Sequence, residues 1–579
     1  MSGVSFSIHD LGIAYRKAKV DFYYSSLSSL LSIADYEEKL LDNLRSLQTR
    51  LESDDESWVR EDDFLGDWTL VPKSIDPPEN DPSKGGLIFS SPAEAWEHAC
   101  ASLGERDGKE KAKAEFRLMA HVSLDFHVLS ALWMLKVGCQ YDRNLTASSY
   151  GNRLRRGEDG EINPLSLGSL KPYLKPFRDW RDNGIQSMRT ALEDNKKIVA
   201  VTADVSSFYH ELNPGFMLKD EFNRLFDLEL TDEEAKLHRL FITAIQAWAD
   251  KTPLRKGLPV GLPASAVVAN MALIELDRLM EKQVAPLYYG RYVDDFLLVM
   301  ENGAGFDSTE DLWEWLFARS DGLLNWKDKE REAVRFKPAY LNDSQILFAN
   351  SKNKVFLLSG EQGKRLVESI AWQIYQRASE WRALPNLPAD ARQIGTDLVA
   401  AVQKDGEAAD NLRKTAALTM RRAGFAIKLR DFEAYERDLP PEIWQAHRHA
   451  FFRAFIQHVL VLPHFFDLST YLPRVIRLAT ACEDFEHLRR ILNALYDLYV
   501  AVDKHCAATI KSCPSASSPA SADILNRWRT QLFDSVRENI IAAFPTRLSR
   551  DGKAGWQEHM AEYCPPDFEA LRIGQYLTV

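Results

Sequence analysis

Two adjacent acids lie within an apolar, aromatic-rich stretch at residues 288–300 (YYGRYVDDFLLVM), and this stretch constrains the fold most. The residues on both sides are typical of β-strands, so the sequence predicts a hairpin that turns at Asp294 and Asp295. Carboxylates in such an apolar element are costly unless a cation neutralises them. Mg²⁺ prefers carboxylate oxygens and is the usual neutraliser. The alternative is a solvated turn that holds two aspartates by chance.

Two segments upstream add to this pattern. Residues 196–204 (KKIVAVTAD) predict a short apolar strand that ends in Asp204. A strand end can hold a metal ligand rigidly, although an isolated aspartate there more often caps the following helix. Residues 257–265 (GLPVGLPAS) form a Gly/Pro turn before a segment with helical apolar spacing. A glycine in such a turn lets the backbone approach a ligand closely.

Basic residues are clustered in three places. Residues 148–157 (SSYGNRLRRG) hold three arginines, and residues 169–184 (SLKPYLKPFRDWRDNG) alternate basic with aromatic side chains. That alternation suits phosphate contacts and base stacking, and the alternative is a surface loop with incidental charge. Residues 413–430 hold six basic residues and no acid, which fits a solvated helix face and a nucleic-acid-facing surface equally well.

The composition is that of a globular protein with several domains. The chain has 579 residues, which predicts roughly 3 to 4 domains. Its net charge of −12 argues against a protein coated in nucleic acid, but a local basic groove remains compatible. No stretch approaches a membrane span, the first residues lack a secretory pattern, and a cytoplasmic location is expected. The scattered cysteines indicate reduced thiols: Cys100, Cys139, Cys482, Cys506, Cys513 and Cys564.

The flanking regions are expected to be mainly helical. Helical patterns cover residues 1–51, 91–137 and 309–317, whereas an acidic run and a Pro/Gly-rich stretch predict a linker or long loop at about 52–90. Two short strands are expected at 345–349 and 354–358. From about residue 361 to 550 the pattern is almost entirely helical and suggests an irregular array of helical pairs, without a clean sequence period.

Taken together, these segments resemble the reverse transcriptases. The resemblance rests on the palm motif ADVSSFY with Asp204, the loop-helix motif GLPVGLPAS…N at 257–270, and the YxDD box at residues 292–295, in the family's order and spacing. The element SSYGNR at 148–153 is similar to a fingers element of bacterial members. The similarity covers about residues 148–360, and the helical flanks look like the abortive-infection and unknown-group branch associated with defence.

This resemblance implies an α+β right-hand polymerase fold with an antiparallel-sheet palm, a helical N-terminal extension and a mostly α-helical, repeat-like C-terminal region. The implied boundaries are 1–90 for the N-terminal extension and linker, 91–195 for the fingers and 196–360 for the palm. Residues 361–579 would form a thumb-like, helical-repeat region.

The resemblance also implies the catalytic site. Asp204 and Asp294 would bridge two Mg²⁺ ions, with Mn²⁺ as a substitute, while the Val205 carbonyl adds a ligand and Asp295 a supporting charge. Three close carboxylates without metal should raise one another's pKa. Further expected contacts to a dNTP are Tyr209, which would exclude a 2′-hydroxyl, and Arg153, Gly261 and Ser265. Lys352 or Lys354 would act as a general acid.

The expected function is dNTP addition by a DNA polymerase of reverse-transcriptase type in antiphage defence. In the family's GxPQG motif Val260 replaces the glutamine, which favours template-independent synthesis that starts from a protein hydroxyl. Tyrosine suits that role, and the candidates are Tyr15, Tyr23, Tyr24 and Tyr576.

Several alternatives stay open at this point. One is RNA-templated cDNA synthesis with a dedicated non-coding RNA, and another is a non-catalytic nucleic-acid-binding scaffold on a polymerase fold. An RNA polymerase is disfavoured by Tyr209. The expected partners are dNTPs and a single-stranded DNA product, with homo-oligomers as a further option and no membrane.

Overall fold

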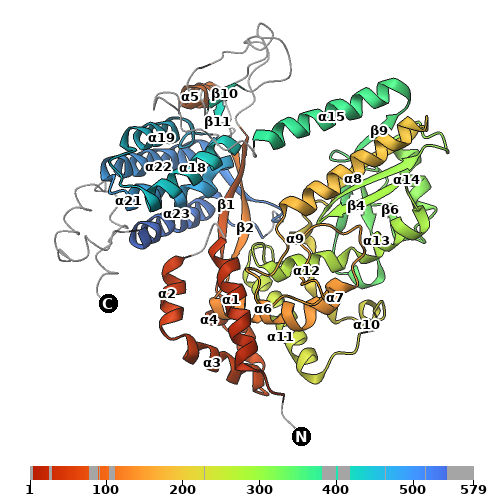
Figure 1. Ribbon diagram of the computed structural model, residues 1–579, viewed down its shortest axis with the longest axis horizontal. Coiled ribbons are helices and arrows are strands. Elements are labelled where there is room, and N and C mark those ends of the chain that lie inside the picture. Colours follow the sequence, from red (N-terminus) through yellow and green to blue (C-terminus); the bar gives the residue numbers. More distant parts are fainter. Residues whose placement is uncertain are drawn as a thin grey trace. The chain divides into compact units, whose positions relative to one another are not determined.

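The computed structural model of this protein contains two compact units (Figure 1). The first unit comprises Met1–Ser25, Ile33–Trp68 and Met119–Tyr375, and the second comprises Ser26–Ser32, Thr69–Leu118 and Gln376–Val579. The structure describes residues 4–24, 29–76, 89, 92–103, 111–226, 228–380, 399–401, 418–420, 422–462, 464–514 and 517–543.

A four-stranded antiparallel sheet forms the centre of the first unit, in the order β4-β5-β3-β9. Its strands confirm the expected hairpin and the strands predicted near 196–204 and 354–358: β3 (Ile198–Asp204), β4 (Tyr288–Tyr292), β5 (Asp295–Glu301) and β9 (Lys354–Leu358). The hairpin turns one residue earlier than expected, at Val293 and Asp294, and Asp295 already pairs with Tyr292. A three-stranded sheet holds the other predicted strand and two more: β6 (Leu324–Trp326), β7 (Ala333–Phe336) and β8 (Ile346–Ala349).

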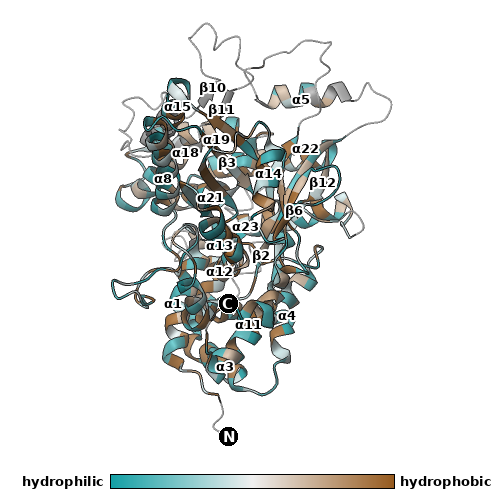
Figure 2. Ribbon diagram, turned by 90° about the vertical axis from the view of Figure 1, so that its right-hand side faces the viewer, coloured by the Kyte–Doolittle hydropathy of each residue, from teal (hydrophilic) through white to brown (hydrophobic). Residues whose placement is uncertain are grey.

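Two helices cover one face of the four-stranded sheet. Ile185 and Leu192 of α8 (Leu174–Glu193) pack with Leu297 and Val299 of β5, because alternate residues of a strand share a face. Val367 of α15 (Gly360–Glu380) joins the same core. Helices such as α1 and α8 carry both hydrophilic and hydrophobic residues (Figure 2), as expected of helices with one packed face.

Local sequence signals explain several helix boundaries. The Thr231 side chain accepts a hydrogen bond from the Glu234 backbone amide, and the Glu234 carboxylate accepts one from the Thr231 backbone amide, which makes a capping box at the start of α11 (Asp232–Lys251). Ser308 caps α14 (Thr309–Phe317), a helix that the sequence predicted. Pro263 opens α12 (Pro263–Ala272), where its missing N–H costs nothing.

The remaining helices of the first unit surround this frame. The N-terminal helices are α1 (Ile8–Tyr24), α2 (Leu30–Glu38), which crosses the unit boundary, α3 (Leu40–Glu52), η1 (Ser57–Arg60) and α4 (Asp62–Leu65). The others are α6 (Leu124–Trp133), η3 (Met134–Gly138), α7 (Cys139–Arg143), α9 (Phe208–Glu211), η4 (Pro214–Leu218), α10 (Asp220–Asn223), α13 (Ile274–Leu279), η5 (Met280–Val284) and η6 (Ala339–Leu341).

Helices also dominate the second unit. They are α5 (Pro92–Leu103), α18 (Arg422–Asp438), α19 (Gln445–His458), α20 (His464–Leu468), η7 (Ser469–Tyr471), α21 (Leu472–Ala481), α22 (Phe485–His505) and α23 (Ser521–Ala543). Within the described residues, no helix combines the length and hydropathy needed to cross a bilayer. The five described cysteines form no disulfide bond.

Three expectations for the flanks were wrong in part. The stretch expected as a loop at 52–90 contains η1, α4 and β1 (Asp67–Asp76), and the helical pattern at 91–137 is interrupted by β2 (Ala112–His121). The region after 361 contains β10 (Val399–Ala401), β11 (Leu418–Met420) and β12 (Cys506–Ile510). β12 pairs in parallel with β2, and the paired residues Cys506 and Ala112 are almost 400 positions apart in the chain. Local sequence patterns do not reveal a pairing over such a distance.

Candidate active site

The three predicted catalytic acids meet at one end of the four-stranded sheet. Asp204 ends β3 and lies directly opposite Asp295, the first residue of β5. Asp294 lies in the turn before β5, and its backbone carbonyl accepts a hydrogen bond from the Val205 amide at 3.1 Å. The antiparallel register therefore brings together carboxylates that are separated by about 90 positions in the chain.

The charges at this sheet end repel one another. Burial and the neighbouring charges of Asp295 and Asp204 raise the pKa of Asp294 to about 6. Burial and Asp204 also raise the pKa of Asp295. Lys352 supplies partial compensation, because its Nζ lies 2.6 Å from Asp204 Oδ2.

These residues fit a divalent metal. Carboxylate oxygens are the donors that Mg²⁺ prefers. Burial first, and the neighbouring carboxylates second, raise the pKa of Asp294, and a bound cation would stabilise its ionised form. Asp204 and Asp294 would hold the ion or ions, with the carbonyl of Val205 and the carboxylate of Asp295 as the further donors predicted from the sequence.

A fully buried ion pair lies behind the catalytic turn. Arg291 of β4 donates to both carboxylate oxygens of Asp277 in α13, at 2.8 and 2.6 Å. The Tyr289 hydroxyl donates to the same carboxylate at 2.7 Å. The sequence analysis missed this pair. The available signals were an acid inside an apolar helix (ALIELDRLM) and an arginine inside the strand YYGRY.

Arg291 also fixes the turn itself. Its Nη1 donates to the Val293 carbonyl at 2.7 Å and to Asn270 Oδ1 at 2.9 Å. Val293 has a φ of 62°, which is strained for a β-branched residue. The buried guanidinium thus holds a strained residue directly before Asp294, and surrounding structure must impose such a conformation.

The SSYGNR element docks on the same turn. The Tyr150 amide donates to the Arg291 carbonyl at 2.8 Å, and the Arg291 amide donates to the Ser148 carbonyl at 2.7 Å. Asn270 Nδ2 donates to the Gly151 carbonyl at 2.8 Å. A Cβ on Gly151 would lie 2.8 Å from the backbone nitrogen of Val293, so a glycine is needed where this element touches the turn.

Arg153 does not point into the site. Its Nε lies 3.0 Å from Oδ1 of the buried Asp142, and Nη2 donates to the Asp142 carbonyl at 2.8 Å. Nη1 donates to the carbonyls of Thr146 and Ser149, both at 3.1 Å. The guanidinium therefore organises residues 142–154, and we leave Arg153 out of the proposed triphosphate contacts.

Tyr209 is placed beside the catalytic turn. Burial and the charge of Asp294 raise its pKa, whereas a hydrogen bond with Asn152 lowers it. Its backbone carbonyl accepts from the Leu258 amide at 2.7 Å, which ties it to the Gly/Pro loop. The phenol therefore interacts with both Asp294 and the SSYGNR element, and its contact with the incoming sugar stays a prediction.

The other predicted nucleotide and proton-donor residues differ in accessibility. Gly261 is exposed with a φ of 105°, whereas Ser265 is fully buried and its hydroxyl has no hydrogen-bond partner within the described residues. Lys354 pairs with Thr202, two residues before Asp204, while Lys352 contacts Asp204 directly. Gly261 is therefore more accessible to a nucleotide than Ser265. Lys352 is closer to the carboxylates than Lys354.

The predicted priming tyrosines differ in their exposure to solvent. Tyr15 is buried and stacks on Tyr36 with ring centroids 5.4 Å apart, and burial raises its pKa. Tyr23 is 52% exposed. The side chain of Tyr24 and all of Tyr576 lie outside the described residues. Among the described candidates, Tyr23 is therefore the accessible one.

Aromatic side chains of the basic segment 169–184 reach the catalytic hairpin. The Phe177 ring lies 5.1 Å from that of Tyr292, and Trp180 Nε1 donates to the Gly290 carbonyl at 2.9 Å. Tyr173 and Phe177 are 59% and 39% exposed. A basic, partly exposed aromatic surface therefore adjoins Tyr292, three positions before Asp295.

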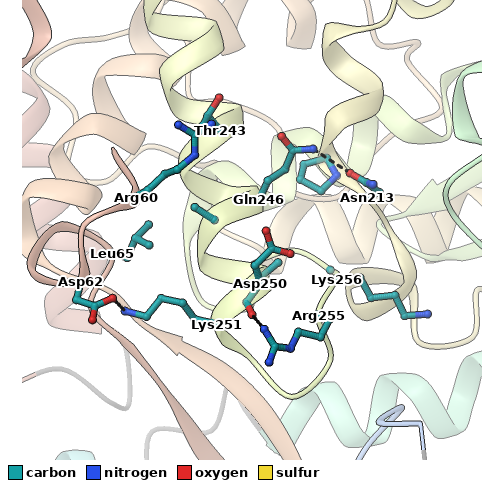
Figure 3. Close-up of a pocket in the computed structure, with 14 residues that line it drawn as sticks. Arg60, Asp62, Leu65, Asn213, Thr243, Gln246, Asp250, Lys251, Arg255 and Lys256 are labelled. Carbon is teal, nitrogen blue, oxygen red and sulfur yellow. Dashed lines mark hydrogen bonds and ion pairs between the residues drawn. The ribbon is translucent and has the colours of Figure 1, made fainter. Parts of the chain in front are cut away.

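A separate pocket of about 500 Å³ opens in the same unit beside Gly257 (Figure 3). Its walls include four basic side chains and two acids, and Lys251 Nζ pairs with Asp62 Oδ1 at 2.8 Å. Arg255 Nη1 donates to the Asp250 carbonyl at 2.5 Å. The predicted catalytic acids are not among the described residues lining this pocket, so it is distinct from the carboxylate site.

Gly151→Ala should destabilise the first unit by about 1–3 kcal/mol, because the new Cβ meets backbone that cannot move without displacing the turn. The measurement is the free energy of unfolding of the wild type and of Gly151→Ala, obtained by chemical denaturation. Gly303→Ala is the matched control: its Cβ meets nothing within 4 Å, and we expect a change within about 0.5 kcal/mol. Equal stability of Gly151→Ala and the wild type would contradict the close contact.

Comparison with known proteins agrees with this geometry. Residues 109–317 match the family model described as reverse transcriptase (RNA-dependent DNA polymerase), and a search of curated proteins found no match. The matched range includes all three carboxylates and supports a polymerase palm, nucleotidyltransferase activity and nucleic-acid partners. The part of the chain that carries the carboxylate site is thus similar to the reverse transcriptases.

Proposed function

We propose that this protein is a Mg²⁺-dependent DNA polymerase of reverse-transcriptase type. The observation that carries the proposal is the convergence of Asp204, Asp294 and Asp295 at one sheet end, within the range that matches the family model. Such a polymerase joins a hydroxyl oxygen to the α-phosphorus of a dNTP, and the bond to pyrophosphate breaks.

Each residue has a role in this proposal. Two bound divalent ions would activate the attacking hydroxyl and stabilise the leaving pyrophosphate. Asp204 and Asp294 hold the cations, and Asp295 adds negative charge beside them. Lys352 would donate a proton to the leaving oxygen, and its ion pair with Asp204 at the sheet end supports this role over that of Lys354. Tyr209 would lie against the sugar of the incoming nucleotide and exclude a 2′-hydroxyl.

Asp294→Asn should abolish dNTP incorporation, with a rate fall of roughly a thousandfold or more, because asparagine lacks the charge that holds the metal. The measurement is incorporation of each labelled dNTP by purified protein with Mg²⁺, with and without RNA. Near-normal incorporation by the variant would refute the assignment of this site.

The same variant offers a control for folding. The pKa of Asp294, about 6 without metal, lies above the ordinary value of 3.8, so ionisation of this group opposes folding. The protonated Asp294 carboxyl favours the folded state. This contribution to the free energy of unfolding is fully present below about pH 4 and is lost as the pH rises through about 6. Metal-free Asp294→Asn should therefore match or exceed wild-type stability at pH 7 to 8, with the difference vanishing near pH 4.

Tyr209→Val should improve the use of rNTPs relative to dNTPs, because the smaller side chain no longer clashes with a 2′-hydroxyl. The measurement is the ratio of kcat/KM for a dNTP and the matching rNTP, compared between variant and wild type. Tyr209→Phe is the matched control and should keep the wild-type preference, since the ring remains. A wild type that uses both nucleotides equally would show that Tyr209 is no gate.

The nucleic-acid partner is proposed from the surface beside Tyr292. Stacking of a base on an exposed aromatic ring contributes about 1–3 kcal/mol, and adjacent Lys171 and Arg178 can contact phosphates. We place a single-stranded DNA product or an RNA strand along this surface. The negative net charge does not oppose this, because binding depends on local charge.

We also propose that synthesis starts from the polypeptide itself and needs no template. The supports are the resemblance to defence-associated reverse transcriptases, Val260 in place of the template-side glutamine, and the exposed Tyr23. A role in antiphage defence rests on the resemblance alone. Equal plaque numbers on cells with wild type and with Asp294→Asn would remove that role.

Protein priming predicts labelled DNA that stays attached to the protein on a denaturing gel until protease is added. Tyr23→Phe should reduce this product most among the described candidates, and Tyr15→Phe is the matched control because Tyr15 is buried. Label that migrates free of protein before proteolysis would overturn priming. Covalent label that survives replacement of Tyr15, Tyr23, Tyr24 and Tyr576 would move the primer elsewhere.

A further inference from the structure

Three potential metal ligands converge in the second unit, where α19 packs against the start of α22. His449 Nε2 lies 3.0 Å from Asp484 Oδ2, and His487 Nδ1 lies 2.9 Å from Asp484 Oδ1. The two imidazole rings are 4.3 Å apart between centroids. One donor atom from each residue lies within 4.8 Å of the others.

We propose that His449, Asp484 and His487 bind a divalent transition metal, with Zn²⁺ as the first candidate. Two imidazoles and a carboxylate form a donor set that suits Zn²⁺ better than Mg²⁺, which prefers an all-oxygen shell. Ligands of tetrahedral Zn²⁺ lie roughly 3.3–3.5 Å apart, given bonds of about 2.0–2.2 Å. The three donor atoms lie within 4.8 Å of one another, so side-chain movement must bring them closer together to reach that spacing.

A second observation concerns His487. Its side chain is only 4% exposed, and Nε2 has no hydrogen-bond partner within the described residues. A buried polar atom of this kind costs about 1–3 kcal/mol. The hydrogen bond to Asp484 therefore uses Nδ1 alone, and Nε2 is the nitrogen of His487 that is left to bind a metal while Nδ1 keeps its contact with Asp484.

Solvent can reach the cluster from the side of His449. His449 is 27% exposed, so water can reach the cluster and complete the coordination shell.

Arg448 shapes the affinity of the site. Its Nε lies 3.1 Å from Asp484 Oδ2, and its Nη1 donates to the Pro441 carbonyl at 2.8 Å. As an outer partner it fixes the orientation of the carboxylate. Its positive charge also opposes a bound cation, so the site should bind more weakly than one without the arginine.

Co²⁺ titration of the full-length protein tests the proposal. Excess Mg²⁺ keeps the catalytic carboxylates from taking up Co²⁺, because Mg²⁺ competes for oxygen ligands. We expect one Co²⁺ per chain, visible bands typical of a tetrahedral site, and displacement by Zn²⁺. A thiolate band is not expected, because none of the three ligands is a cysteine.

Variants locate the site. His449→Gln and His487→Gln should each weaken Co²⁺ binding by about 100-fold or more. His447→Gln, on the same helix but outside the cluster, is the matched control and should bind as the wild type does. Zn²⁺ should raise the melting temperature of the wild type and of His447→Gln but not of His449→Gln.

Two results would overturn the proposal. One is the absence of a saturable Co²⁺ spectrum in the wild type, which would leave the cluster as a buried set of hydrogen bonds and ion pairs. The other is wild-type binding by His449→Gln. If His487→Gln does not fold, the partly exposed His449 still decides the question, because its replacement disturbs the core less.

Discussion

The buried pair of Arg291 and Asp277 is the interaction on which the catalytic region depends. Taking two charges out of water is expensive, and the cost is offset only when geometry and hydrogen bonds are nearly complete. Here the contact is bidentate, and Tyr289 and Asn270 supply further polar partners. Removal of one partner would leave a buried charge, so each member constrains the others.

This pair connects segments that are distant in sequence. Arg291 bonds the Val293 carbonyl in the turn, and Asn270 joins Arg291 to Gly151 of the SSYGNR element. Contacts from strand β4, helix α12 and the SSYGNR element together thus hold the strained turn before Asp294. Such rigidity matters because the three carboxylates repel one another and would separate on a softer scaffold.

The sequence predicted the central sheet because strands β3 and β5 carry their own local pattern, and the acids stand at their ends. It predicted neither the Arg291–Asp277 pair nor the true place of Arg153, because a pattern shows that a charge exists but not which distant residue neutralises it. Strand β2 was missed although Ala112, Ala114, Phe116 and Leu118 alternate as buried residues. That alternation could have predicted β2 from the sequence. No local pattern in the sequence indicates that β12 pairs with β2.

Charge compensation at the sheet end also links metal and nucleic acid. Among the described residues, one ion pair, with Lys352, compensates the three acids there, so without metal their remaining charge would repel a polyanionic strand at the adjoining Tyr292 surface. Cations bound by Asp204 and Asp294 would reverse the sign of that local field. Metal binding and strand binding should therefore strengthen each other, even in a chain whose net charge is −12, because binding depends on the local charge and not on the total.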